Sequence, residues 1–112
     1  MPESGHTWRK AFKGIPEEAR NVRVWTAGRL GHPDAPLIAN ELFAAVLGAR
    51  PDSIEMTLST AGTRIRIAAH GFVPLSFLQI HGPGVILIGQ LANASGVSED
   101  DQTLWALFGE ES

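Results

Sequence analysis

The sequence contains no cysteine, which excludes a disulfide framework, a thiol nucleophile and a thiolate metal site. Its four histidines lack the spacing of metal ligands, so we predict no metal site. No apolar run approaches the roughly 20 residues that a membrane-spanning helix needs. The segment 1–5 is polar and unlike a signal peptide. We therefore predict a cytoplasmic protein without a membrane partner.

Charged residues are also sparse, at 19% of the chain, and they are unevenly distributed. Residues 1–66 carry all nine basic residues and seven acids, whereas residues 67–112 carry five acids and no base. The formal net charge is −3, which does not fit the basic surface of a nucleic-acid binder, so we predict no nucleic-acid partner. A small basic cluster near the N-terminus is either a solvated surface or a patch facing a protein partner. Its members are Arg9, Lys10, Lys13, Arg20 and Arg23.

The length of 112 residues is that of one domain, and no repeat or linker divides the chain. Weak alternation over 8–12 predicts an edge strand. Pro16 with two following acids is typical of a helix start, and 31–33 ends that segment. Asp34 is the expected N-cap of a second helix. The apolar stripe of this helix comprises Leu37, Ile38, Leu42, Ala45, Val46 and Ala49.

A clearer pattern follows in the second half of the chain. Apolar residues alternate with polar ones over 54–59 and again over 64–67, around Ala61-Gly62, which predicts a β-hairpin with one buried face. We expect a loop over 71–82 and a last strand over 103–108, whereas 85–88 fits a buried strand or a helix. The predicted fold is an α/β (α+β) two-layer sandwich, with helices on one face of a mixed, largely antiparallel sheet.

The order of short motifs resembles that of the GHKL, or histidine-kinase-like, ATPase superfamily, in particular the small bacterial anti-sigma-factor serine kinases. Glu41-Leu42 stands for the first family motif, Ala69-His70-Gly71 for the second, Gly82-Pro83-Gly84-Val85 for the third and Thr103 for the fourth. The resemblance covers about residues 8–108 and implies a Bergerat-type ATPase fold with about three helices. It also implies a helix over 85–94 and a shortened nucleotide lid between Gly71 and Gly82.

The resemblance assigns a role to several positions of a nucleotide site. Glu41 matches the family's general base, and Gly71, Gly82, Gly84 and Thr103 match other parts of the site. Two positions have lost the family ligand. Ala45 stands where the family has a magnesium-binding Asn, and Ala69 where it has the adenine-reading Asp; a methyl group can replace neither. Pro83 lacks a backbone donor for phosphate, and no Lys or Arg follows Arg66.

These losses predict a degenerate, non-catalytic ATPase domain without a cofactor, which acts as a regulatory protein-binding module. The resemblance implies a sigma factor or an anti-sigma antagonist as its partner. An alternative is a divergent ATP- and magnesium-dependent serine protein kinase that uses Glu41 as its base. A third reading is a small domain built into a larger assembly. Whether the chain forms a homodimer stays open.

Overall fold

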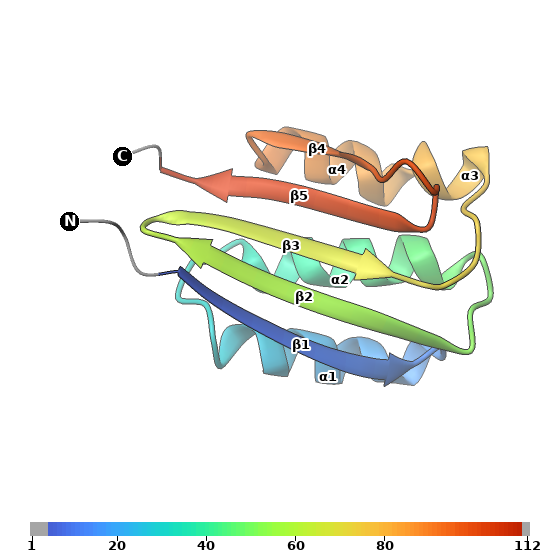
Figure 1. Ribbon diagram of the computed structural model, residues 1–112, viewed down its shortest axis with the longest axis horizontal. Coiled ribbons are helices and arrows are strands. Elements are labelled where there is room, and N and C mark those ends of the chain that lie inside the picture. The colour runs from blue at the N-terminus through green and yellow to red at the C-terminus, as the bar shows by residue number, and fades with distance from the viewer. Residues whose placement is uncertain (1–4, 111–112) are drawn as a thin grey trace.

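The computed structural model describes residues 5–110, which form one five-stranded sheet in the order β1-β2-β3-β5-β4 (Figure 1). The strands are β1 (Gly5–Lys13), β2 (Ser53–Ala61), β3 (Arg64–His70), β4 (Ala94–Val97) and β5 (Thr103–Gly109). Every neighbouring pair is antiparallel, so the prediction of a mixed sheet is wrong. The reason is β4, which the sequence analysis missed. This strand reverses the chain after the preceding helix, so β5 returns antiparallel to β3 instead of parallel to it.

The helices lie behind the sheet in Figure 1 and cover one of its two faces. They are α1 (Ala19–Ala27), which follows a 3₁₀ turn at Pro16–Glu18, α2 (Ala35–Leu47), the short α3 (Phe77–Ile80) and α4 (Pro83–Leu91). The predicted two-layer α+β architecture is thereby confirmed. The stretch 85–88 is helical rather than a strand. Within residues 5–110, no helix is long and apolar enough to cross a membrane.

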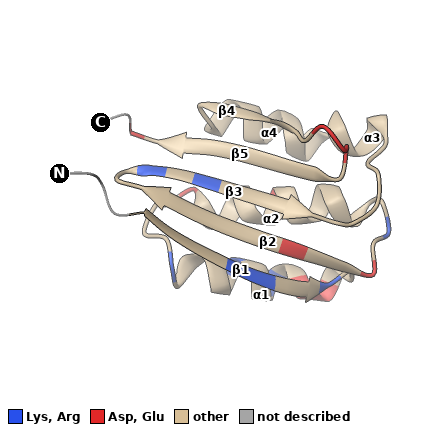
Figure 2. Ribbon diagram, in the orientation of Figure 1, with Lys and Arg blue, Asp and Glu red and all other residues tan. Residues whose placement is uncertain are grey.

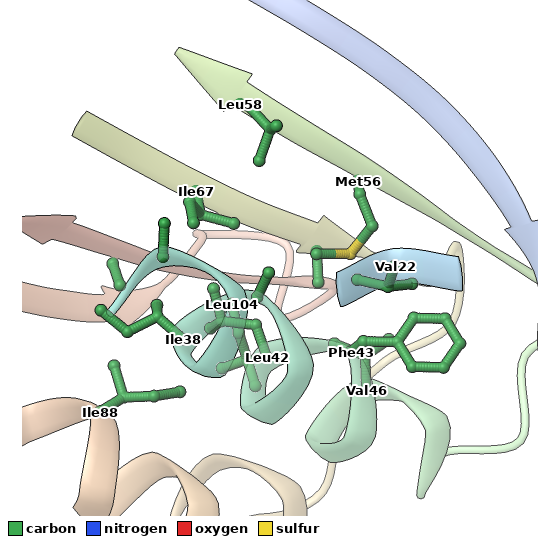
Figure 3. Packing of buried hydrophobic residues seen from close by; sticks show 14 of the residues in the cluster. Val22, Ile38, Leu42, Phe43, Val46, Met56, Leu58, Ile67, Ile88 and Leu104 are labelled. Carbon is green, nitrogen blue, oxygen red and sulfur yellow. The ribbon is translucent and has the colours of Figure 1, made fainter. Parts of the chain in front are cut away.

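The core lies between α2 and the covered face of the central strands (Figure 3). Strand alternation directs Ile54, Met56 and Leu58 of β2 into it, and β3 and β5 contribute their own alternate residues. Helix α2 meets them with Ile38, Leu42, Phe43 and Val46, which are at most 1% exposed. Leu37 departs from the predicted stripe, because it lies on the outer side of α2 and is 40% exposed.

The opposite face of the sheet is not covered by any described helix (Figure 1). Pairing in register divides the N-terminal basic cluster between the two faces. Lys10 pairs with the fully buried Met56 and so lies on the helix-covered side, whereas Arg9 and Lys13 lie on the open side. Arg23 on α1 donates a hydrogen bond to Oδ1 of Asn40 at 2.7 Å, within the helical layer. The cluster therefore does not form a single positive face.

Candidate functional site

A cleft of about 330 Å³ lies between α2 and the start of α4, and it gathers four of the residues assigned by the motif order. Helix α2 supplies Glu41 and Ala45 one turn apart, while the turn into α4 supplies Gly82 and Gly84. The remaining lining residues are Ala44, Gly48, Leu78, Gln79, Pro83 and Val85. Residues from distant parts of the sequence thus meet at the place where the resemblance puts the metal and the phosphates.

The Glu41 side chain lies directly against the turn that opens α4. A Cβ added to Gly84 would stand only 2.6 Å from Oε2 of Glu41, so glycine is what allows this approach. Gly82 is the N-cap of α4 and Pro83 occupies its first turn. The free N–H groups and the positive end of the helix dipole attract an anion at this point. In this structure the carboxylate of the chain's own Glu41 lies beside this point.

Electrostatics make the cleft unsuited to a polyanion. Glu41 is the one charged residue among the described residues that line it. The chain carries no Asp, Glu, Lys or Arg from Ile67 to Ser98, and Figure 2 accordingly shows α3 and α4 without charge. A bound triphosphate needs cationic side chains or a metal ion to neutralise it. The cleft offers a carboxylate instead, which would repel the phosphates.

Ala69, the position assigned to adenine recognition, does not reach this cleft. It is fully buried in the middle of β3, where it pairs with Met56 of β2 and Leu104 of β5. Its methyl group is part of the hydrophobic core. The base-binding end of the expected site is therefore packed with side chains.

Gly71 is buried just after β3, also away from the lining of the cleft. A Cβ at this position would stand 2.7 Å from Cγ1 of Val46 and 3.4 Å from Cβ of Pro51. The φ angle of Gly71 is not among the positive ones, so its backbone conformation does not require glycine. Close packing against α2 is the physical reason for glycine at this position.

Thr103 begins β5, as predicted, but its hydroxyl points to the open face of the sheet. There Thr103 Oγ1 and His70 Nδ1 share a hydrogen bond of 2.7 Å, and the ring of Phe72 packs edge-on against His70. The nearby loop 98–102 brings Asp100 to the same end of the sheet. Hydrogen bonds from the Ser98 hydroxyl and the Gln102 amide, together with the charge of His70, lower the pKa of Asp100 below its usual value.

The segment 71–82, expected to be a shortened lid, holds the short helix α3, which the sequence analysis did not predict. Ser76 caps α3, and the Gln79 side-chain oxygen accepts a hydrogen bond from the Ser76 amide at 2.9 Å. The Ser-x-x-Gln spacing at 76–79 is a capping-box signal that could have indicated this helix. Phe77 and Leu78 on α3 remain 74% and 76% exposed.

Comparison of the chain with protein-family models finds no match, and comparison with curated proteins finds none. In the part of the chain that the structure describes, no group of three or more His, Asp or Glu side chains is placed to hold a metal ion. The cleft therefore offers a ligand three features: the Glu41 carboxylate, the start of α4 and an apolar wall.

Proposed function

We propose that this chain is a degenerate GHKL-type ATPase domain with a Bergerat-like fold and a shortened lid, which regulates a protein partner by binding it and performs no catalysis. The anti-sigma partner switch is the kind of system that the motif resemblance implies. The observation that carries the proposal is the Glu41 carboxylate at the start of α4, in a cleft with no cationic lining residue.

The two ends of the expected site support the same proposal in different ways. At the α2–α4 end, Ala45 faces the cleft but has no oxygen with which to bind magnesium. At the β3 end, Ala69 and Gly71 are buried in packed surroundings that leave no room for a base. A nucleotide would meet repulsion at one end and steric exclusion at the other.

Exposed apolar side chains support a role in protein binding. Phe77 and Leu78 on α3 and Ile86 on α4, which is 61% exposed, lie in the charge-free stretch of the chain. Apolar surface exposed in this way often marks a protein-interaction site. Phe77 and Leu78 also lie in the segment 71–82, where the resemblance would put a lid over a nucleotide.

The alternative function, a serine protein kinase with Glu41 as general base, needs this carboxylate free to accept a proton from an attacking hydroxyl. The carboxylate lies against Gly84, in the turn that the motif resemblance assigns to phosphate binding. A negative charge beside that turn would repel the phosphates of ATP, which favours the non-catalytic proposal.

A titration calorimetry experiment with ATP and magnesium tests the proposal. We expect no binding at millimolar nucleotide, because each missing charged or buried hydrogen bond costs about 1.5–3 kcal/mol, and several losses amount to about three or more decades in affinity. The variant Ala45→Asn, which returns the metal ligand, should also fail to bind. A low-micromolar Kd for the wild-type protein would contradict the proposal and favour the kinase.

A further inference from the structure

The open face of the sheet carries a charge pattern of its own. Strand register places Arg9, Lys13, Arg64 and Arg66 on this face, with Glu55 as the one acid among the described strand residues there. Figure 2 shows these basic positions on β1 and β3 and the acid on β2. Because no described helix covers this side, the basic side chains face outwards (Figure 1).

Two of these arginines line a shallow hollow of about 330 Å³ on the open face. Arg64 and Arg66 of β3 stand between Ser59, Thr60 and Ala61 of β2 and Leu107 of β5, which complete the lining. Guanidinium groups form paired hydrogen bonds with carboxylates, and the Ser59 hydroxyl adds another donor. The hollow thus combines cationic donors with the apolar side chain of Leu107, a combination that suits a carboxylate borne on an amphipathic segment.

An apolar platform adjoins the hollow in the next row of the sheet. Trp105 pairs with Ala68 on one side and Gly96 on the other, and Ala68 is only 6% exposed. A Cβ at Gly96 would stand 2.9 Å from Cζ2 of Trp105, so the missing side chain allows the ring to lie across β4. The Arg66 guanidinium is 5.5 Å from the centre of this ring, which holds the arginine beside the apolar surface.

We propose that this open sheet face docks an acidic, amphipathic segment of a protein partner. Its carboxylates would sit over Arg64 and Arg66, and an apolar side chain would rest on Trp105. The inference rests on the proposed protein-binding function and assigns it a surface and a partner chemistry. Charge complementarity selects the occupant, since a face with four bases and one acid attracts acidic groups and repels basic ones.

Protein is favoured over nucleic acid by the surroundings of this face. A nucleic-acid backbone carries a charge at every nucleotide and needs an extended basic surface, whereas Glu55 and Asp100 interrupt the basic surface at the end of the sheet near His70. A short acidic segment over Arg64 and Arg66 lies at the other end of β3, away from these acids. Single-stranded nucleic acid also needs a series of aromatic rings on which bases stack. On the described strands this face offers only two aromatic rings, Trp105, which is half-buried, and His70, which packs against Phe72.

The experiment is a selection from a random peptide library displayed on yeast, with the wild-type protein as bait. We expect the enriched peptides to be rich in Asp and Glu and to carry Leu, Phe or Trp. One enriched peptide is then titrated against Arg64→Glu/Arg66→Glu, which should weaken binding about tenfold or more at low salt. Circular dichroism checks that this variant is folded, and the neutral pair Arg64→Gln/Arg66→Gln should weaken binding less.

The matched control is Arg20→Glu/Arg23→Glu, an equal charge reversal on α1, which should leave peptide affinity unchanged. Acidic peptides that bind the Arg64→Glu/Arg66→Glu variant with wild-type affinity would overturn the assigned surface but leave the protein-binding function standing. Enriched peptides without acidic residues, or no enrichment, would overturn the inference. The proposed function is tested separately, by the titration with ATP and magnesium. Binding of an oligothymidine that Arg64→Glu/Arg66→Glu abolishes would make the face a nucleic-acid surface and refute the proposal.

Discussion

The two ends of the expected nucleotide site differ in the surroundings of the alanine that stands where the motif resemblance expects a ligand. At the α2–α4 end, Ala45 still faces an open cleft, and Glu41 lies across the start of α4. At the β3 end, Ala69 is fully buried between its neighbours on β2 and β5. An alanine beside solvent leaves space for a larger side chain, whereas an alanine inside the sheet is part of the core. The fold can therefore accept a polar side chain at Ala45 but not at Ala69.

The largest effect is expected at the β3 end of the expected site, which we call the closed end. The change is Ala69→Asp, which supplies the acid that the motif resemblance expects there. This change puts a carboxyl group into a fully buried apolar position without a partner, and it should lower the free energy of unfolding by about 3 kcal/mol or more. Urea unfolding measures the difference. The control Ala44→Asp places the same group on the exposed wall of the cleft, and it should cost only about 1 kcal/mol, from lower helix propensity and from a negative charge in the last turn of α2. Equal effects at both positions would abolish the distinction between the two ends.

A smaller effect is expected from Gly71→Ala, which tests how tightly the closed end is packed. The added methyl group meets Val46 Cγ1 at 2.7 Å and should cost about 1–3 kcal/mol of stability. In a double-mutant cycle with Val46→Ala, the combined loss should be smaller than the sum of the single losses, because the removed methyl groups make room.

The control for this change is Gly89→Ala on α4, where an added Cβ meets no atom within 4 Å. Alanine favours a helix over glycine, so this variant should gain about 0.5–1 kcal/mol in thermal or urea unfolding. Additive losses at Gly71 and Val46 would show that the closed end tolerates the extra volume.

The smallest effect is expected at the α2–α4 end of the expected site, from Glu41→Gln. Removing the negative charge beside the start of α4 should lower stability by about 0.3–1 kcal/mol at low ionic strength, and high salt should reduce the difference. Unfolding of both proteins at two salt concentrations measures this. Glu99→Gln, in the exposed loop between β4 and β5, should show no such salt-dependent loss. A gain in stability for Glu41→Gln would mean that the negative charge of Glu41 beside α4 destabilises the fold.

Much of the fold could be predicted because its elements have clear periodicity. The β2–β3 hairpin and α2 bury one face each, and their alternating or helical patterns are visible in the sequence. Strand β4 has no such pattern. Its residues Ala94–Val97 are half-buried or exposed at the edge of the sheet, and pairing with β5 alone makes them a strand. The error in sheet type followed directly from this omission.

The candidate site was predictable only in part, for a related reason. Motif order placed Glu41, Ala45 and Gly84 in one region, and the structure brings them together in the cleft. Side-chain direction could not be obtained in the same way. Thr103 faces the open side of the sheet toward His70, and the register that decides this depends on long-range pairing. The open basic face was missed because Arg64 and Arg66 become neighbours of Trp105 and Leu107 only when β3 and β5 pair.

The strand order also sets the sequence separation between the paired residues of neighbouring strands. Strands β2 and β3 are joined by a short turn, and β4 and β5 by a short loop, so both hairpins close at little entropic cost. The β1–β2 and β3–β5 ladders are different, because pairs such as Phe12–Ile54 and Ile65–Phe108 join strands with two α-helices between them in the sequence. We therefore expect the β2–β3 hairpin to nucleate folding, and β1 and the β4–β5 hairpin to join it late. The refolding rate should be set by this slow long-range closure rather than by helix formation.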